Sequence, residues 1–251
     1  MLEYKIQLLV EQAKAIMQKT HDPIHDVEHA KRVAEHAEML GSQMPLSDSQ
    51  RDALVLAAWW HDASRVITRR PSFIIMPFFD DLLSAFMLWF ATIRYGLFGS
   101  VAGMATRLIF CKSMGTGKIL TRVLLRKQNR ILLDILKDAD ALDALRVDRI
   151  RKMLPYIQSS RAYHLGYKIM TWWMLSSKHL KLKTAVARTY LEKIVKEFLA
   201  WLHEQPVYQW FAEEFGHAWL EKNIARAQLF LHQLHAHNQR RSYVHTFRSS
   251  T

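Results

Sequence analysis

The chain has little of what stabilises small secreted proteins. Its 251 residues contain one cysteine, Cys111. A single cysteine excludes an intramolecular disulfide framework and any cysteine-rich zinc site, and it fits a reducing compartment. At the N-terminus no apolar segment follows a basic start, so no cleavable secretory signal is expected. These absences predict a cytoplasmic protein.

Glycine and proline are also scarce, with 8 and 6 residues. No alternating runs of β-branched residues bounded by turn residues mark strands or hairpins. Half of the residues are hydrophobic and 23% are charged, which excludes the composition of a disordered chain. We therefore expect an all-α fold, with helices at about 4–17, 27–40, 47–62, 79–95, 98–111, 117–145, 147–158, 161–178, 180–204 and 207–238.

The expected organisation is one helical domain with an extension. Residues 1–147 form the domain, which includes an apolar insertion near 73–110. Residues 148–238 form a C-terminal helical extension packed on it, and residues 239–251 form a loose basic tail. The tryptophans of the extension are expected to pack its helices rather than stack on bases: Trp172, Trp173, Trp201, Trp210 and Trp219.

The chain has fewer acidic than basic residues. Lysine and arginine number 35 against 23 acidic residues, which leaves a net charge of +12. This positive charge predicts an anionic partner: nucleic acid, a phosphorylated metabolite or a lipid surface. The excess concentrates in Lys112–Arg130, with six basic residues and no acid, and after Glu221, with five basic residues and no acid.

Residues 82–106 are long and apolar enough to require a membrane test. They carry one charge, Arg94, and the pair Gly99 and Gly103 in a Gly-x-x-x-Gly spacing. Arg94 divides the segment into two uncharged runs of 12 residues, each too short to span a bilayer. A spanning helix, a helix on the membrane surface, and a buried core or oligomer helix remain as interpretations, of which the last is favoured.

The histidines and aspartates form a pattern typical of a metal site. His25 and His29 are four residues apart and share a helix face. His61 and Asp62 end an apolar helix. Adjacent helical residues diverge by about 100°, so this pair can share a metal only from different sides or at a helix end. Asp140 and Asp143 are three residues apart in a helix with apolar flanks, and one carboxylate here would complete a set of two imidazoles and two carboxylates, which suits a catalytic first-row divalent metal.

Two other patterns are weak. Gly115–Lys118 matches half of a P-loop, but the first glycine of that motif would have to be residue 112, which is Lys, and Ile119 stands where Ser or Thr is required. Near the C-terminus, His235 and His237 point to different faces of a helix and do not form a metal clip with His232.

In order and setting, residues 20–147 resemble the HD-domain superfamily of metal-dependent phosphohydrolases. The family's His-x-x-x-Val helix matches His29 with Val33, its His-Asp pair matches His61 and Asp62, and its last ligand matches Asp140. The upstream His-Asp-x-x-His run of one subgroup begins at His25. The resemblance implies a metal held by His29, His61, Asp62 and Asp140. Because these ligands must meet, a single membrane span between Asp62 and Asp140 is excluded.

The resemblance also implies roles for neighbouring residues. Asp62 contacts both metal and water, and His25 donates a proton to the leaving oxygen, binds phosphate, or simply packs. Arg32, Arg65 and Lys137 neutralise phosphate charge or are solvated. Asp138 and Asp143 orient the ligating histidines or cap a helix.

Departures from the family narrow these expectations. Larger subgroups bind a second metal through histidines that this chain lacks between 63 and 139, so one divalent ion is expected, with Mn, Fe, Co, Ni, Mg and Zn not distinguished. Some nucleotidase members carry an acid where this chain has Arg65, which argues against a carboxylate base at that position.

Two functions are compatible with the sequence. The first is a phosphohydrolase, acting on mono- or diesters, that hydrolyses a nucleotide or another small phosphorylated compound. The second is a catalytically degenerate binding or regulatory module that uses its basic segments on nucleic acid or an anionic membrane surface. A peripheral membrane location and a homo-oligomer are compatible with either.

Overall fold

The structure is a computed structural model and describes residues 2–68, 76–97, 99–113, 116–175 and 182–248. Every regular element in these ranges is a helix, which confirms the all-α prediction. The chain divides into two compact units, Met1–Asp143 and Ala144–Thr251. The division falls shortly before the boundary expected at residue 147.

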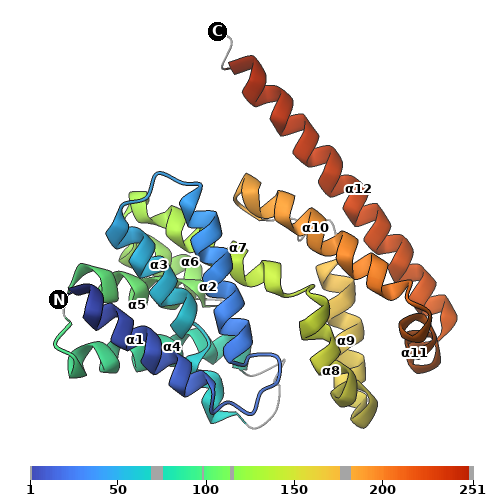
Figure 1. Cartoon of the computed structure of the whole chain (residues 1–251), viewed down its shortest axis with the longest axis horizontal. Coiled ribbons are helices and arrows are strands. Elements are labelled where there is room, and N and C mark those ends of the chain that lie inside the picture. The colour runs from blue at the N-terminus through green and yellow to red at the C-terminus, as the bar shows by residue number, and fades with distance from the viewer. Residues whose placement is uncertain (1, 69–75, 98, 114–115, 176–181, 249–251) are drawn as a thin grey trace. The chain divides into compact units, whose positions relative to one another are not determined.

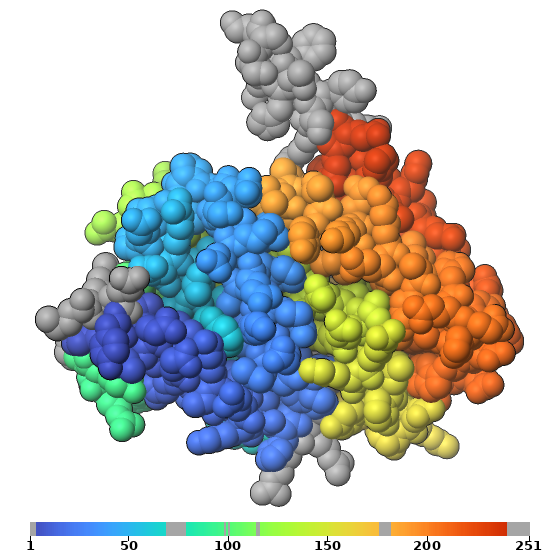
Figure 2. Space-filling model, viewed as in Figure 1, coloured from blue at the N-terminus to red at the C-terminus, as the bar shows by residue number. Residues whose placement is uncertain are grey.

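The first unit holds seven α-helices and two short 3-10 helices within its described residues: α1 (Leu2–Met17), α2 (Val27–Ser42), α3 (Asp48–Trp60), η1 (Ala63–Ile67), α4 (Met76–Arg94), α5 (Ser100–Lys112), α6 (Gly117–Leu124), η2 (Lys127–Asn129) and α7 (Arg130–Asp143). Helix α2 packs against α3 and α7, and α5 packs against α3, α4 and α7 (Figure 1). Dark-blue α1 and the adjacent α2 cover neighbouring parts of one face (Figure 2).

Local capping fixes the starts of the two helices that carry the histidines. Asp26 caps α2 by accepting a hydrogen bond from the backbone N–H of His29 at 2.9 Å. At α3, Ser47 and Gln50 form a reciprocal capping box. The buried Trp60 donates its indole N–H to the Leu9 carbonyl at 2.9 Å, which ties the end of α3 to α1. The caps thus fix where α2 and α3 begin, and this bond holds the end of α3, next to His61, against α1.

The apolar segment 82–106 is divided between two helices. Helix α4 ends at Arg94, Gly96 has φ +63°, and α5 begins at Ser100. The apolar side chains of α5 are largely buried, as the core interpretation predicts, but one face of α4 exposes six large hydrophobic side chains: Phe79, Leu83, Phe86, Trp89, Phe90 and Ile93. No described helix is both long and apolar enough to cross a bilayer.

The single helix predicted over 117–145 is wrong. Helix α6 ends at Leu124, η2 follows, and α7 begins at Arg130. Leu125 is buried in extended backbone. Five consecutive polar residues from Arg126 to Arg130 cannot continue an apolar helix face. The chain therefore turns at this point.

The second unit contains α8 (Val147–Ser159), α9 (Arg161–Met174), α10 (Ala185–Leu202), α11 (Gln205–Phe215) and α12 (His217–Arg248). Thr184 caps α10, so the helix predicted over 180–204 begins later than expected; residues 180–181 lie outside the described residues. The helix predicted over 207–238 is interrupted by Gly216, whose φ of +88° is a conformation that glycine tolerates.

The loose tail predicted after residue 238 is helical as far as Arg248. No glycine or proline occurs between His217 and Arg248, so nothing in the sequence stops α12. Residues 249–251 lie outside the described residues.

The tryptophan prediction for this unit is confirmed in part. Trp201 is buried, and Trp219 of α12 stacks on Phe215 of α11, whereas Trp210 meets the neighbouring Phe211 edge to face within α11. Trp172 and Trp173 are about half exposed, because α9 buries Tyr167 and Thr171 instead.

Candidate metal centre

His29 is hydrogen-bonded to Asp143, the last residue of the first unit. It lies in the first turn of α2 and is fully buried. Its Nδ1 lies 2.7 Å from Oδ2 of the buried Asp143, the last residue of α7. Arg32, three residues further along α2, donates to both oxygens of Asp143 at 2.5 and 3.1 Å. With Nδ1–H donating to Asp143, the lone pair of His29 is on Nε2.

His61 has a similar arrangement built from local backbone. It caps the C-terminus of α3, and its Nδ1 lies 2.7 Å from the Ala58 carbonyl, which can only accept a hydrogen bond. In the neutral ring its lone pair is therefore also on Nε2. Neither His29 Nε2 nor His61 Nε2 has a hydrogen-bond partner, although both are buried. The two imidazole rings lie 5.3 Å apart between centroids.

Two carboxylates face these nitrogen atoms. Oδ1 of Asp140 lies 3.6 Å from His29 Nε2 and 3.8 Å from His61 Nε2. His29, His61 and Asp140 form a group that can hold a metal ion, with ligand atoms all within 4.8 Å of one another. Oδ2 of Asp62 lies 3.2 and 3.4 Å from the same two nitrogens. Asp62 has left the helix, with φ −114° and ψ 14°, so the His-Asp pair converges at a helix end as the sequence requires.

The charges of the group favour ionised carboxylates. Burial opposes the ionisation of Asp62, but His61, His25 and His29 outweigh it and hold its pKa well below the usual value. For Asp140 burial is likewise outweighed, mainly by the ammonium group of Lys112, and the pKa is lowered. Burial disfavours the charged form of His61, yet Asp62 raises its pKa. Ionised oxygens thus face the histidine nitrogens.

Lys112 and Asp81 belong to the site, and the sequence analysis missed both. Lys112 Nζ lies 3.0 Å from Oδ2 of Asp140 and 3.2 Å from Oδ1 of Asp81. Burial disfavours the charged form of Lys112, but Asp140 and Asp81 outweigh it and raise its pKa. The sequence did contain a signal for both residues: Lys112 ends the apolar helix α5, and Asp81 stands near the start of the apolar helix α4. Charges in such helices need buried partners.

Arg65 is buried in a separate ion-pair network. Its guanidinium lies 3.6 Å from Asp22 and pairs more closely with Asp80. Its carbonyl accepts hydrogen bonds from Thr20 and Thr68. This placement links the segment before α2, η1 and α4, and it favours a structural role over contact with phosphate.

His25 lies beside the cluster. Its Nδ1 is 3.0 Å from Oδ2 of the buried Asp22, and its ring meets that of His29 edge to face at 5.6 Å. Burial opposes ionisation of Asp22, but the hydrogen bond and charge of His25 outweigh it and lower its pKa. The side chain of His25 is 14% exposed, so it borders the cluster from the solvent side.

The remaining predicted residues lie on α7. Asp143 accepts a hydrogen bond from His29, as expected of an orienting carboxylate, and Asp138 is buried. Lys137 is exposed, and partial burial of its amine followed by repulsion from Lys112 lowers its pKa. Of the three C-terminal histidines, which lie on α12, His235 pairs with Glu192 at 3.1 Å.

Comparison with known proteins adds no relative: no protein-family model, no curated protein and no solved structure matches the chain. Interpretation of the centre therefore rests on its geometry.

Proposed function

We propose that the protein is a metal-dependent phosphohydrolase of the HD-domain type, acting on a nucleotide or another small phosphorylated compound. The observation that carries the proposal is the pair of buried Nε2 atoms of His29 and His61, which lack hydrogen-bond partners and face carboxylate oxygens. Buried polar atoms without partners are costly, and a ligated cation removes that cost.

The donor set fits one divalent cation. His29, His61, Asp62 and Asp140 supply two imidazole nitrogens and two carboxylate groups, a mixed set typical of catalytic sites. Both histidines have an oriented Nδ1–H, the arrangement that fixes metal-binding imidazoles in proteins. Asp140 already pairs with the ammonium group of Lys112, whereas Asp62 has no ion pair with a lysine or arginine among the described residues, so a bound cation would balance its charge.

The chain's own residues can then perform hydrolysis. A divalent ion bound here supplies Lewis acidity and lowers the pKa of a water molecule. Asp62 is ionised and beside both ligating nitrogens, so it can accept a hydrogen bond from the attacking water and orient it. His25, at the solvent side and paired with Asp22, can donate a proton to the leaving oxygen. Lys112 holds Asp140 in place and adds positive charge near the phosphate.

The test is turnover combined with metal content. Elemental analysis of the purified protein identifies the metal, and phosphate release is measured on nucleotides and generic phosphoesters with Mn, Co, Ni, Mg or Zn. We expect Asp62→Ala to reduce the rate by about 100-fold or more. Asp148→Ala, an exposed carboxylate of the second unit, is the matched control and should retain the rate. Wild type and Asp62→Ala equally inert across the panel, with metal still bound, would contradict the proposal.

The exposed face of α4 favours a second candidate function, docking on an anionic membrane surface. Its side chains recur at helical spacing and are 39% to 62% exposed, a contiguous apolar face that is uncommon on a monomer. Phenylalanine, tryptophan, leucine and isoleucine are the side chains of interfacial helices, and the net charge of +12 complements anionic lipid.

Flotation with phosphatidylserine-containing vesicles tests this role. Phe86→Ser with Phe90→Ser should abolish co-flotation, whereas Ile119→Ser, which changes a 67% exposed residue of α6, should retain it. Wild type that remains with the unbound fraction, or a double variant that floats like wild type, would contradict membrane docking.

A further inference from the structure

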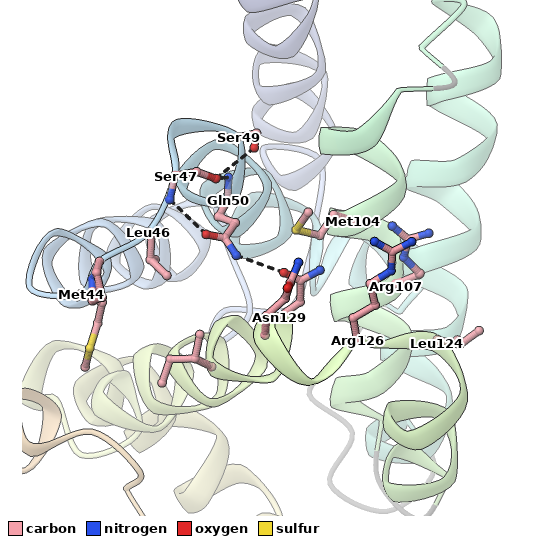
Figure 3. A pocket seen from close by; sticks show the side chains of 13 residues that line it. Met44, Leu46, Ser47, Ser49, Gln50, Met104, Arg107, Leu124, Arg126 and Asn129 are labelled. Carbon is pink, nitrogen blue, oxygen red and sulfur yellow. Dashed lines mark hydrogen bonds between the residues drawn. The ribbon is translucent and has the colours of Figure 1, made fainter.

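The first unit contains a pocket that the metal centre does not use. Its volume is about 850 Å³, within the range of small-molecule sites. It lies between the start of α3, the middle of α5 and the segment that joins α6 to α7 (Figure 3). The lining includes Ser47, Gln50, Met104, Arg107, Arg126 and Asn129.

The pocket is positively charged. Arg107 and Arg126 both line it, and no aspartate or glutamate does. Both arginines are exposed, and neither forms an ion pair with any residue in the described ranges. Arg126 also belongs to the acid-free basic segment 112–130. Two guanidinium groups left without carboxylates at one pocket suit a phosphorylated ligand, which each can bind with paired N–H groups.

The rest of the lining is preformed and mixed in polarity. Gln50 Nε2 donates to Asn129 Oδ1 at 3.0 Å, which ties α3 to η2 across the pocket. The capping box already occupies Ser47 and Gln50, so the arginines, and not the start of α3, are the groups available to an anion. Apolar side chains cover other parts of the wall: Met44, Leu46, Met104, Leu124 and Ile131. An apolar moiety can pack there while phosphate meets the arginines.

The pocket and the metal centre lie at opposite ends of the same helices. Helix α3 begins at the pocket and ends at His61, and α7 begins beside Asn129 and carries Asp140 in its last turn. His61, which caps the C-terminus of α3, is 11 positions after Gln50, and this corresponds to about 16 Å along the helix. None of the metal-centre residues lines the pocket. A phosphate at the metal is thus not the phosphate that Arg107 and Arg126 would bind.

We propose that this pocket is a second binding site, for a phosphorylated small molecule that carries an apolar group, as a nucleotide does. Phosphate pairs with Arg107 and Arg126, and the apolar group packs against the side of the pocket formed by Leu46, Met104 and Ile131. The proposal does not depend on turnover at the metal centre.

Binding is tested on the metal-stripped full chain, so that the metal centre cannot contribute. The probes are ADP, adenosine and inorganic pyrophosphate, measured by titration calorimetry and by NMR of ¹³C-methyl-labelled methionine. Met44 and Met104 line the pocket, whereas Met17 is buried in the core away from it and serves as the internal reference. We expect ADP to shift the Met44 and Met104 signals and to bind at least tenfold more tightly than adenosine or pyrophosphate.

The variant Arg107→Gln/Arg126→Gln should weaken ADP binding at least tenfold. Lys118→Gln/Arg122→Gln is the matched control, since it removes two exposed charges from α6 outside the pocket and should change the affinity less than twofold. The proposal is overturned if ADP at millimolar concentration leaves the Met44 and Met104 signals in place, if adenosine binds as tightly as ADP, or if the two double variants weaken binding equally. An inactive phosphohydrolase that still binds ADP here would leave this site standing and remove only the proposed activity.

Discussion

Asp143→Asn isolates the contribution of one buried carboxylate to the metal centre. Asp143 is fully buried and accepts from His29 Nδ1 at 2.7 Å and from Arg32 at 2.5 and 3.1 Å. The amide of Asn is nearly the same size but has one acceptor oxygen, and its NH2 group can only donate. Oδ2 of Asp143 accepts from both His29 Nδ1 and Arg32 Nη2, and Oδ1 accepts from Arg32 Nε. With its amide oxygen at the Oδ2 position, Asn leaves Arg32 Nε facing an N–H. In the opposite orientation it leaves His29 Nδ1 and Arg32 Nη2 facing one.

The size of the effect follows from that loss. Breaking a buried ion pair costs about 3–5 kcal/mol, and an unsatisfied buried donor about 1–3 kcal/mol. The side chain of Arg32 is 14% exposed, so water replaces part of the lost interaction and the lower range, about 2 kcal/mol, applies. For the metal, loss of a carboxylate that orients a ligating histidine reduces affinity by roughly 10-fold to 100-fold.

Two measurements check these values. Thermal unfolding should show a lower Tm for Asp143→Asn, by about 4–8 °C, because 1 kcal/mol corresponds to about 2–4 °C in a chain of this size. Competition with a chelator should show the weaker metal affinity. Asp148→Asn, which changes a 60% exposed carboxylate, is the control for both. If Asp143→Asn bound metal as tightly as wild type while His29→Ala bound none, Asp143 would not position His29.

Three further predictions concern stability. Gly216→Ala should destabilise the protein by about 1–2 kcal/mol because the φ of residue 216 is +88°. Gly103→Ala should stabilise it by about 0.5–1 kcal/mol, since residue 103 lies inside α5 and a Cβ there meets nothing within 4 Å. Urea unfolding measures both changes. The hydrogen bond from Lys196, followed by that from His235, lowers the pKa of Glu192. Because a lowered carboxyl pKa stabilises the fold only above the unfolded value, near 4.3, Glu192→Gln should lower the urea midpoint at pH 7, and the difference should disappear as the pH falls through the folded pKa.

The controls for these predictions come from the same chain. Glu213→Gln removes an exposed carboxylate from α11 and should leave the urea midpoint at pH 7 unchanged. A difference between Glu192→Gln and wild type that does not shrink as the pH falls below the unfolded value would contradict the Glu192 prediction. Equal stability of Gly216→Ala and wild type would show that the break between α11 and α12 does not require glycine.

Most of the candidate centre was predicted from the resemblance to the HD-domain pattern, which depends on the order of several motifs that are each weak alone. Local spacing contributed that His29 and Val33 share a face of α2 and that His61 and Asp62 stand at the end of an apolar helix. Asp143 accepts from a histidine 114 residues earlier in the chain. Its role as an orienting carboxylate was named only as one alternative, because no local pattern distinguishes it from a solvated residue.

Features that depend on distant packing could not be predicted in this way. Lys112 and Asp81 are 31 residues apart and meet only because α4 packs on α5. Composition likewise predicted a buried α4, although one of its faces is exposed. In each case the deciding contact is non-local.

The apolar region between the His-Asp pair and Asp140 contributes directly to the charge of the centre. Asp140 presents Oδ1 to the histidines and Oδ2 to Lys112, so a displacement of α5 would move the ammonium group relative to a metal ligand. Arg107, which lines the proposed ADP pocket, lies on the same helix, five residues before Lys112, or about 8 Å along its axis. If the sites are coupled, linkage requires ADP to change metal affinity by the factor by which metal changes ADP affinity. Equal ADP affinities in metal-loaded and metal-stripped protein would mean that α5 transmits nothing between them.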